Sequence, residues 1–230
     1  MKDSKRNKKE ANIIVAAEDV FSSVGFKNAK MEDIAEAAGI TKVTLYTYFQ
    51  SKENLYLAIT YKAITLLNDK FYNTLDEYKS KSGIESAIAL LDAFMTFCEN
   101  NYLYSEALLD YFALVRSTSA NKNSSKLTDA TKESLYYMKL QDIQNLAFKL
   151  SAKEIIRGQE DGSIIKSLDP MRSTLQAWTS IIGYIKVLSA SGDNKSPLFN
   201  ISLGDLKENT LKVAHVLLSH EETVNQIEKL

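Results

Sequence analysis

Proline occurs only twice in the 230 residues of this chain, at Pro170 and Pro197, and this scarcity limits the possible folds more than any other feature. Proline interrupts helices, so the chain keeps long stretches in which helices can form. Hairpin signals are missing too, because no Asn-Gly or Asp-Gly pair lies between alternating apolar runs. Apolar residues instead recur about every three or four positions. The sequence therefore predicts an all-α protein.

The helical spacing of apolar residues, together with glycines, capping residues and proline, divides this chain into its expected helices. Glycine interrupts the pattern at Gly25 and Gly39. Ser51 precedes an acidic first turn and is expected to cap a helix, while Asp169-Pro170 joins a capping residue to a proline suited to the first helical position. The expected helices cover about residues 7–24, 31–38, 42–49, 52–78, 84–99, 102–119, 125–157, 170–192 and 205–227.

The lengths of these helices suggest two domains. The first three are short and close together in the sequence, whereas the later ones are longer. We expect a three-helix N-terminal domain over residues 1–55 and a larger helical bundle over residues 56–230. A hydrophobic content of 45% is enough to give the bundle a sizeable core.

Charge is distributed unevenly along the chain. The formal net charge is -1, so the protein as a whole is not a polycation. The first ten residues nevertheless hold five basic residues against two acidic ones, a local balance of +3. A basic arm of this kind can bind phosphate locally, and it is equally compatible with a solubilising tail.

The remaining composition suggests a cytoplasmic protein. The single cysteine, Cys98, excludes an internal disulfide and suits a reducing compartment. No apolar run approaches the roughly 18 residues of a membrane-spanning helix, and no apolar segment follows the charged N-terminus as in a secretion signal. We therefore expect no membrane partner.

The segment around Gly39 has the pattern of a helix-turn-helix. The expected second and third helices are joined by "AGIT", in which Gly39 supplies a left-handed turn residue and Ile40 is expected to fill the corner. In this motif the second of the two helices enters the major groove of DNA. The third helix of this chain is therefore a candidate for reading DNA.

The composition of that third helix supports the same reading. Leu45 and Phe49 are four residues apart and are expected to face the core. The other positions carry hydroxyls and one charge, which suit contacts to phosphates and base edges better than a solvated face would need. The alternative is a face buried against another helix. The candidate DNA contacts are Thr41, Lys42, Thr44, Tyr46, Thr47 and Tyr48.

Residues 16–59, "AAEDVFSSVGFKNAKMEDIAEAAGITKVTLYTYFQSKENLYLAI", resemble the TetR-type (TetR/AcrR) transcriptional regulators. The family pattern opens with A-x-x-[LV]-F-x-x-x-G-[FY] and continues with I-A-x-x-A-G-[IV]-[ST]. It closes with x-x-[TS]-[LF]-Y-x-[YH]-F-x-[SN]-K-x-x-L. The resemblance covers about a fifth of the chain and implies a DNA-binding regulator.

The resemblance also implies roles for individual residues. Lys42 and Thr47 occupy positions that vary in the family, where base-reading residues are expected. Tyr46, Tyr48 and Lys52 correspond to phosphate contacts. The family usually has Thr or Ser as the cap of the second helix, where this chain has Lys30. Lys30 is therefore a further candidate for a phosphate contact, unless Asn28 acts as the cap of this helix.

In the larger domain, two apolar helices predict a dimer interface. The helix over 170–192 is apolar over a wide arc, and the last helix has a narrow apolar seam. Two such helices per subunit can pack across a two-fold axis, and an ordinary intramolecular core is the alternative. The candidate interface residues are Trp178, Ile181, Ile182, Ile185, Val213, Leu217 and Val224.

A small-molecule effector is expected from the resemblance, although the sequence says little about its site. Aromatic residues crowd the middle of the chain, where they suit either a core or a pocket. Tyr111 and Tyr137 are candidate polar contacts in such a pocket. Arg116 is a candidate partner for an anionic group, or else interacts with a helix end.

Motifs for catalysis and metal binding are missing from the sequence. His215 and His220 are the only histidines, and their spacing of five does not suit shared metal ligation. No phosphate-binding glycine loop or nucleophile elbow occurs. We expect a ligand-responsive homodimeric repressor without catalytic residues, metal or cofactor, in which effector binding tilts the fourth helix. The alternative is a helical binding or interaction module that no longer reads DNA.

Overall fold

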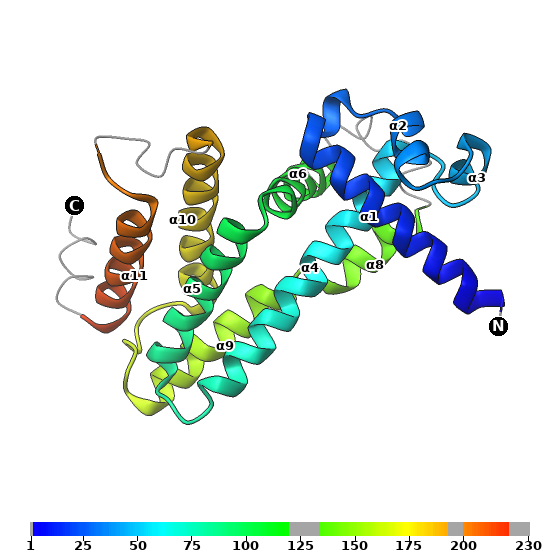
Figure 1. Ribbon diagram of the computed structural model, residues 1–230. Helices are drawn as coiled ribbons and strands as arrows, with labels where there is room; N and C mark the ends of the chain where they lie inside the picture. Colours follow the sequence, from blue (N-terminus) through cyan, green and yellow to red (C-terminus); the bar gives the residue numbers. More distant parts are fainter. Residues whose placement is uncertain (1, 120–133, 193–199, 221–230) are drawn as a thin grey trace. The chain divides into compact units, whose positions relative to one another are not determined.

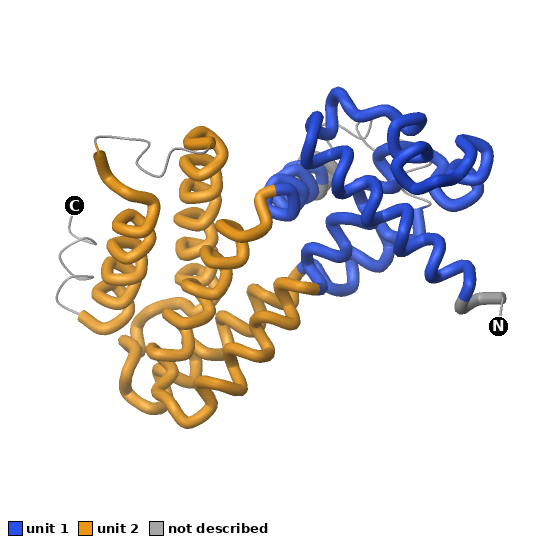
Figure 2. The backbone as a smooth tube through the Cα atoms, viewed as in Figure 1, with its two compact units in different colours: residues 1–65, 103–144 blue, residues 66–102, 145–230 orange. Residues whose placement is uncertain are grey.

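The computed structural model describes residues 2–119, 134–192 and 200–220, with side chains from residue 5 to 114 and throughout the two later ranges (Figure 1). All regular elements in these ranges are α-helices, which confirms the predicted all-α class. The chain divides into two compact units, residues 1–65 with 103–144 and residues 66–102 with 145–230 (Figure 2). The predicted domain boundary at residue 55 stays a prediction.

Unit 1 holds the predicted three-helix N-terminal region and two further helices. Gly25, with φ 75° and ψ 156°, breaks the helical geometry of the first helix where the sequence predicts its end. Ser51 Oγ accepts a hydrogen bond from the backbone N–H of Asn54 at 3.2 Å, as predicted for a cap. Unit 1 contains α1 (Lys2–Asn28), α2 (Met31–Ala37), α3 (Lys42–Tyr46), the first part of α4 (Lys52–Glu77), most of α6 (Tyr102–Ser119) and α8 (Leu135–Ile143).

The core of unit 1 is formed by apolar residues of α1 to α4. Each fully buried Leu, Ile or Phe contributes about 1.5–3 kcal/mol, so this cluster fixes the short helices α2 and α3 that propensity alone would not stabilise. Its members include Ile13, Ala17, Phe21, Ile34, Leu45, Phe49, Leu55 and Ile59.

Aromatic residues from later in the chain complete unit 1. Tyr104 of α6 donates its hydroxyl hydrogen bond to Glu18 at 2.8 Å, and Tyr136 of α8 donates to Glu10 at 2.5 Å. The Tyr136 ring also stacks near Phe49, with centroids 6.2 Å apart. These residues therefore serve the packing of unit 1.

Unit 2 contains the remaining helices. Asp169 accepts a hydrogen bond from the Arg172 backbone N–H at 2.6 Å, so α10 begins at Asp169-Pro170 as predicted. Helix α5 packs against α9, α10 and α11. The helices of unit 2, besides the last part of α4, are α5 (Gly83–Asn100), α9 (Leu146–Asp161), α10 (Pro170–Ser191) and α11 (Leu203–Ser219).

The prediction of one continuous helix over residues 125–157 is wrong. Residues 120–133 lie outside the described part, and the rest is divided between α8 and α9 by a break at Gln144 and Asn145. The Gln144 side chain accepts a hydrogen bond from the Tyr111 hydroxyl at 3.0 Å, and Asn145 is the N-cap residue of α9. The Asn145 side chain makes no capping hydrogen bond, whereas the contact of Gln144 with Tyr111 is a side-chain interaction found at the break.

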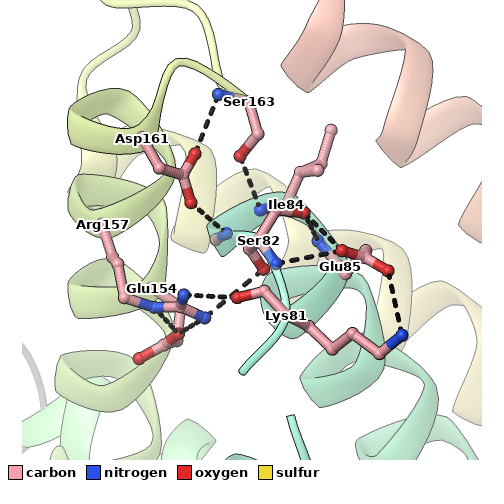
Figure 3. Close-up of polar contacts among 9 residues, drawn as sticks. Lys81, Ser82, Ile84, Glu85, Glu154, Arg157, Asp161 and Ser163 are labelled. Carbon is pink, nitrogen blue, oxygen red and sulfur yellow. Dashed lines mark hydrogen bonds and ion pairs between the residues drawn. The ribbon is translucent and has the colours of Figure 1, made fainter. Parts of the chain in front are cut away.

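Helices α5 and α9 approach each other closely at two glycines. A Cβ on Gly83 would lie 2.1 Å from the backbone nitrogen of Gly158, so only glycine fits at this crossing. Asp161 accepts a hydrogen bond from the Gly83 N–H at 2.7 Å. Arg157 donates to the carbonyl of Lys81 at 2.6 Å (Figure 3). The first turn of α5 is therefore fixed to α9 by backbone contact and by charged side chains.

Candidate nucleic-acid interface

The tight turn between α2 and α3 presents α3 on the surface of unit 1. Gly39 has φ 64°, and the N–H of Ile40 donates to the carbonyl of Ala35 at 3.0 Å. Ile40 packs against the core, as the sequence predicts. Leu45 of α3 and Phe49, which follows the end of α3, are buried, so the other side of this short helix is left free to contact a partner.

The three threonines of this segment stabilise the ends of α3 and remain at the surface. Thr41 is the N-cap, and its hydroxyl oxygen accepts from the Thr44 N–H at 3.2 Å. The Thr47 hydroxyl donates to the Thr44 carbonyl at 2.7 Å. Thr41 and Thr47 are exposed and Thr44 is half-buried. Their hydroxyl oxygens keep acceptor capacity, while their local bonds explain how so short a helix persists.

Lys42 is exposed on the same face and forms an ion pair that sequence reasoning missed. Its ammonium bonds to the Glu32 carboxylate of α2 and lies 5.9 Å from the centroid of the Tyr46 ring. The hydrogen bond from Lys42 lowers the pKa of Glu32, and the same bond raises the pKa of Lys42. Glu32 therefore places a negative charge beside the predicted base-reading lysine.

The tyrosines of this face differ in exposure. Tyr46 is exposed, whereas Tyr48 is half-buried. The guanidinium of Arg6 lies 5.8 Å from the centroid of the Tyr48 ring, which places a basic residue of the first turns of α1 next to this face. Lys5, Lys8 and Lys9 are exposed along the same turns.

The Lys52 ammonium is surrounded by backbone carbonyls from the region where α1 ends. Its Nζ lies 2.7 Å from the carbonyl oxygen of Phe26 and 2.9 Å from that of Ala29. It also lies 4.6 Å from the centroid of the Phe26 ring. A lysine that satisfies carbonyls at the end of α1 has little capacity left for phosphate. This geometry favours a role in folding over the predicted phosphate contact.

Lys30 occupies the N-cap position of α2 without a capping side-chain hydrogen bond. Asn28 does not take over this role, because its side chain donates to the Val24 carbonyl at 3.0 Å. The Lys30 side chain is exposed. An anion near the first N–H groups of α2 is compatible with this arrangement.

Comparison with known proteins supports the helix-turn-helix reading. Residues 13–59 match the model of the bacterial regulatory proteins of the tetR family. HTH-type transcriptional regulator RutR of Escherichia coli strain K12 is 52% identical over 51 residues, which is 22% of this chain and 24% of RutR. Uncharacterized HTH-type transcriptional regulator YvdT of Bacillus subtilis strain 168 is 31% identical over 140 residues, covering 60% of this chain and 66% of YvdT. The chain belongs to the TetR family.

The similarity of this TetR-family regulator to RutR spans only about a quarter of the length of RutR. The structure of transcriptional regulator FadR from Bacillus subtilis in complex with stearoyl-CoA has a TM-score of 0.63, over 90% of this chain and 98% of FadR. The sequence identity is 16%, so the likeness shows the fold. Members of this family are transcriptional regulators rather than enzymes. In the described ranges no helix is both long and apolar enough to cross a bilayer.

The predicted effector contacts with described side chains are not among the residues that line the pocket of unit 2. That pocket, of about 820 Å³, is lined by residues of unit 2, whereas Tyr111 and Tyr137 belong to unit 1. Tyr111 is buried, which raises its pKa, and its hydroxyl donates to Gln144. The side chain of Arg116 lies outside the described residues. An effector role for these three residues stays a prediction.

The predicted dimer residues of the regulator fall into different environments. Ile181 and Ile185 are buried within unit 2 and have little surface left for a partner. Trp178, Ile182 and Leu217 are half-buried, and Val213 is 49% exposed. Four of the set also line the pocket: Trp178, Ile181, Val213 and Leu217. Val224 lies outside the described residues.

Proposed function

We propose that this TetR-family protein is a homodimeric transcriptional repressor of the bacterial cytoplasm that binds a near-palindromic operator through α3 and responds to a small-molecule effector. The observation that carries the proposal is the exposed hydroxyl-rich face of α3, anchored by the buried Leu45 and Phe49. A rigid anchor beneath polar groups suits a helix that must keep its register in the major groove.

The contacts proposed for this face follow from residue chemistry. The Tyr46 hydroxyl is a donor for a phosphate oxygen, which fixes position without reading sequence. Thr47 and Lys42 can reach base edges, where a threonine methyl suits thymine and a lysine suits guanine. Lys42 must first leave Glu32, and this is inexpensive because exposed ion pairs contribute little to stability.

The homodimer is supported by exposed apolar side chains on α10 and α11. Leu175 is 47% exposed and Val213 is 49% exposed, and Met171 and Val216 are also exposed. Apolar side chains on two adjacent helices are a feature of dimer surfaces. Two copies would present two α3 helices to half-sites about 34–36 Å apart, one turn of the duplex.

Effector binding is supported by the pocket of unit 2, whose volume suits a small molecule. The structural neighbour FadR was crystallised with stearoyl-CoA, so this fold accommodates a small-molecule ligand in that protein. An effector that releases the operator must bind the non-binding state more tightly than the binding state.

The proposal is tested by selecting bound duplexes from a random pool with the full chain. The expected result is an enriched inverted repeat, and a reporter gene behind it should be silenced by the protein. Recovery of random sequence would instead favour a module that does not read DNA, and stimulation of the reporter would make the protein an activator.

Variants then locate the reading face on the recovered duplex. Tyr46→Ala should weaken binding to all sequences by about tenfold, because it removes a phosphate contact. Thr47→Ala should change the preferred base at one position of each half-site instead. Tyr72→Ala is the matched control, since Tyr72 is also an exposed tyrosine but belongs to unit 2. Equal affinities for Tyr46→Ala and Tyr72→Ala would refute this docking geometry.

A further inference from the structure

A long pocket lies within unit 2 between α5, α9, α10 and α11. On α10 its lining residues run from Arg172 to Val187, and on α11 they run from Leu206 to Leu218. At 1.5 Å per helical residue, the α10 wall is about 22 Å long. A volume of about 820 Å³ spread over such a length makes the pocket narrow. This shape favours a long, thin ligand over a compact ring system.

The walls of this pocket are mainly apolar. The rings of Phe148 and Trp178 meet edge to face, with centroids 5.6 Å apart. Two of the lining hydroxyl groups are satisfied within their own helices, since Thr174 donates to the carbonyl of Pro170 and Thr210 to that of Leu206. Most of the pocket therefore offers hydrocarbon contact and few hydrogen bonds. Aliphatic and aromatic members of the lining include Leu91, Phe94, Ile155, Ile181, Val213 and Leu217.

Among the described residues that line the pocket, positive charge is found at one end. Arg172, in the first turn of α10, is the only charged residue of this described lining, and its side chain is exposed. Among the described residues no carboxylate forms an ion pair with its guanidinium, and the nearby Asp169 carboxylate accepts the Arg172 backbone N–H. Toward the other end, Tyr184 donates to Glu99, which is paired with Lys207 at 3.3 Å. The unpaired charge thus lies at the α10 N-terminus.

We propose that this pocket binds a single-chain amphiphile with an anionic head group, the apolar chain lying along α10 and the head group at Arg172. Burial of the chain against the apolar walls supplies the affinity, and the guanidinium accepts a carboxylate or phosphate in a bidentate pair. The inference rests on the proposed function in one respect only, since it names the chemical class of the effector. Binding itself does not require DNA.

The chain carries its own reporter for this test. Trp178 is the only tryptophan and lines the pocket, so its fluorescence responds to an occupant. Octanoate, dodecanoate, dodecyl phosphate and dodecanol should be titrated into the full chain below the concentrations at which they aggregate. The two anionic head groups distinguish a carboxylate from a phosphate ligand, and dodecanol has the same chain without a charge.

We expect saturable binding of one dodecanoate or dodecyl phosphate per chain. Affinity should rise by roughly a hundredfold from octanoate to dodecanoate, because four more methylenes are buried. Dodecanol should bind about tenfold more weakly than the tighter of the two anions. No saturable change in Trp178 emission with any of the probes, or equal affinity for dodecanol and both anions, would overturn the proposal.

Arg172→Gln should abolish the preference for the anion and leave dodecanol affinity unchanged, which a loss of structure would not do. Lys186→Gln is the matched control, because Lys186 is an exposed base of the same helix outside the pocket. A preference that survives Arg172→Gln would refute the assigned head-group site.

Operator binding without ligand is measured separately. Intact DNA binding with no amphiphile binding refutes this inference alone, and the reverse result refutes only the DNA-binding proposal.

Discussion

Lys52 shows how one side chain can stabilise a helix end far away in the sequence. Its ammonium donates to the carbonyls of Phe26 and Ala29 and also lies 3.3 Å from that of Lys27. The break at Gly25 leaves carbonyls at the end of α1 without helical partners, and Lys52 satisfies them. In this environment lysine is part of the folding of unit 1.

Lys52→Met keeps the length of the side chain but removes its charge and donors. We expect it to lower the free energy of unfolding by about 1–3 kcal/mol, because partly buried carbonyls lose their donor. Urea denaturation measures the change. Lys9→Met, at an exposed position of α1, should change the stability little. If both variants are equally stable while Lys52→Met loses DNA affinity, Lys52 is a phosphate contact after all.

Glu32 pairs with the Lys42 ammonium at the α3 face and would compete for it with DNA in the proposed complex. Glu32→Gln should raise affinity for all duplexes by a few-fold and steepen the logarithmic salt dependence by about one, because the charge of Lys42 is then fully available to the duplex. Fluorescence anisotropy over a salt series measures both. Asp19→Asn makes the same change of charge on α1 and should leave the salt slope as it is. An unchanged slope for Glu32→Gln would mean that Lys42 does not reach the duplex.

At the scale of helices, the contact between α5 and α9 is the tightest feature of unit 2. Gly83→Ala would place a methyl 2.1 Å from the Gly158 nitrogen, and backbone atoms cannot move aside as a side chain can. We expect a loss of about 3 kcal/mol in the free energy of unfolding. Gly183→Ala, within α10 and with no atom inside 4 Å of the added methyl, should instead gain about 0.5–1 kcal/mol. Similar values for the two variants in urea denaturation would contradict this packing.

The same junction makes the stability of unit 2 depend on pH. Hydrogen bonds from Ser163 and from the Gly83 N–H hold the pKa of Asp161 below its ordinary value. A lowered pKa in the folded state stabilises the protein above the unfolded value of about 3.9, and this stabilisation is lost as the pH falls through the lowered pKa.

Asp161→Asn should therefore reduce stability at neutral pH and flatten the decline of stability below about pH 4. Urea denaturation between about pH 3 and 7 measures this dependence. Asp205→Asn, at an exposed position of α11, is the control and should retain the decline of the unmodified chain. A decline below pH 4 that is equally steep in Asp161→Asn would show that Asp161 is not responsible.

The sequence predicts those helix ends that are determined by residues close to them in the sequence. Gly25, Ser51 and Asp169-Pro170 mark ends of helices where local chemistry alone decides. The break at Gln144 was missed, because it involves Tyr111, 33 residues earlier. At the α3 face the exposed residues were predictable from their spacing, whereas Glu32 and the partners of Lys52 were not. These contacts join residues 10 to 26 positions apart, and no local pattern reports them.

At the scale of the whole molecule, net charge cannot account for the proposed binding to DNA. The chain has 28 basic and 29 acidic residues, so the proposed attraction to the duplex must come from a local face. The proposed face combines α3 with the basic first turns of α1, where Arg6 lies against Tyr48. A protein of this kind should bind random duplex weakly and its operator tightly.

Footprinting of the selected operator by the ligand-free full chain is the decisive test of DNA reading by α3. We expect two protected major-groove segments about one helical turn apart at low salt, with Tyr46→Ala losing protection in both and Tyr72→Ala retaining it. A duplex that stays fully accessible at low salt, while the protein remains folded, would contradict the claim that α3 docks in DNA.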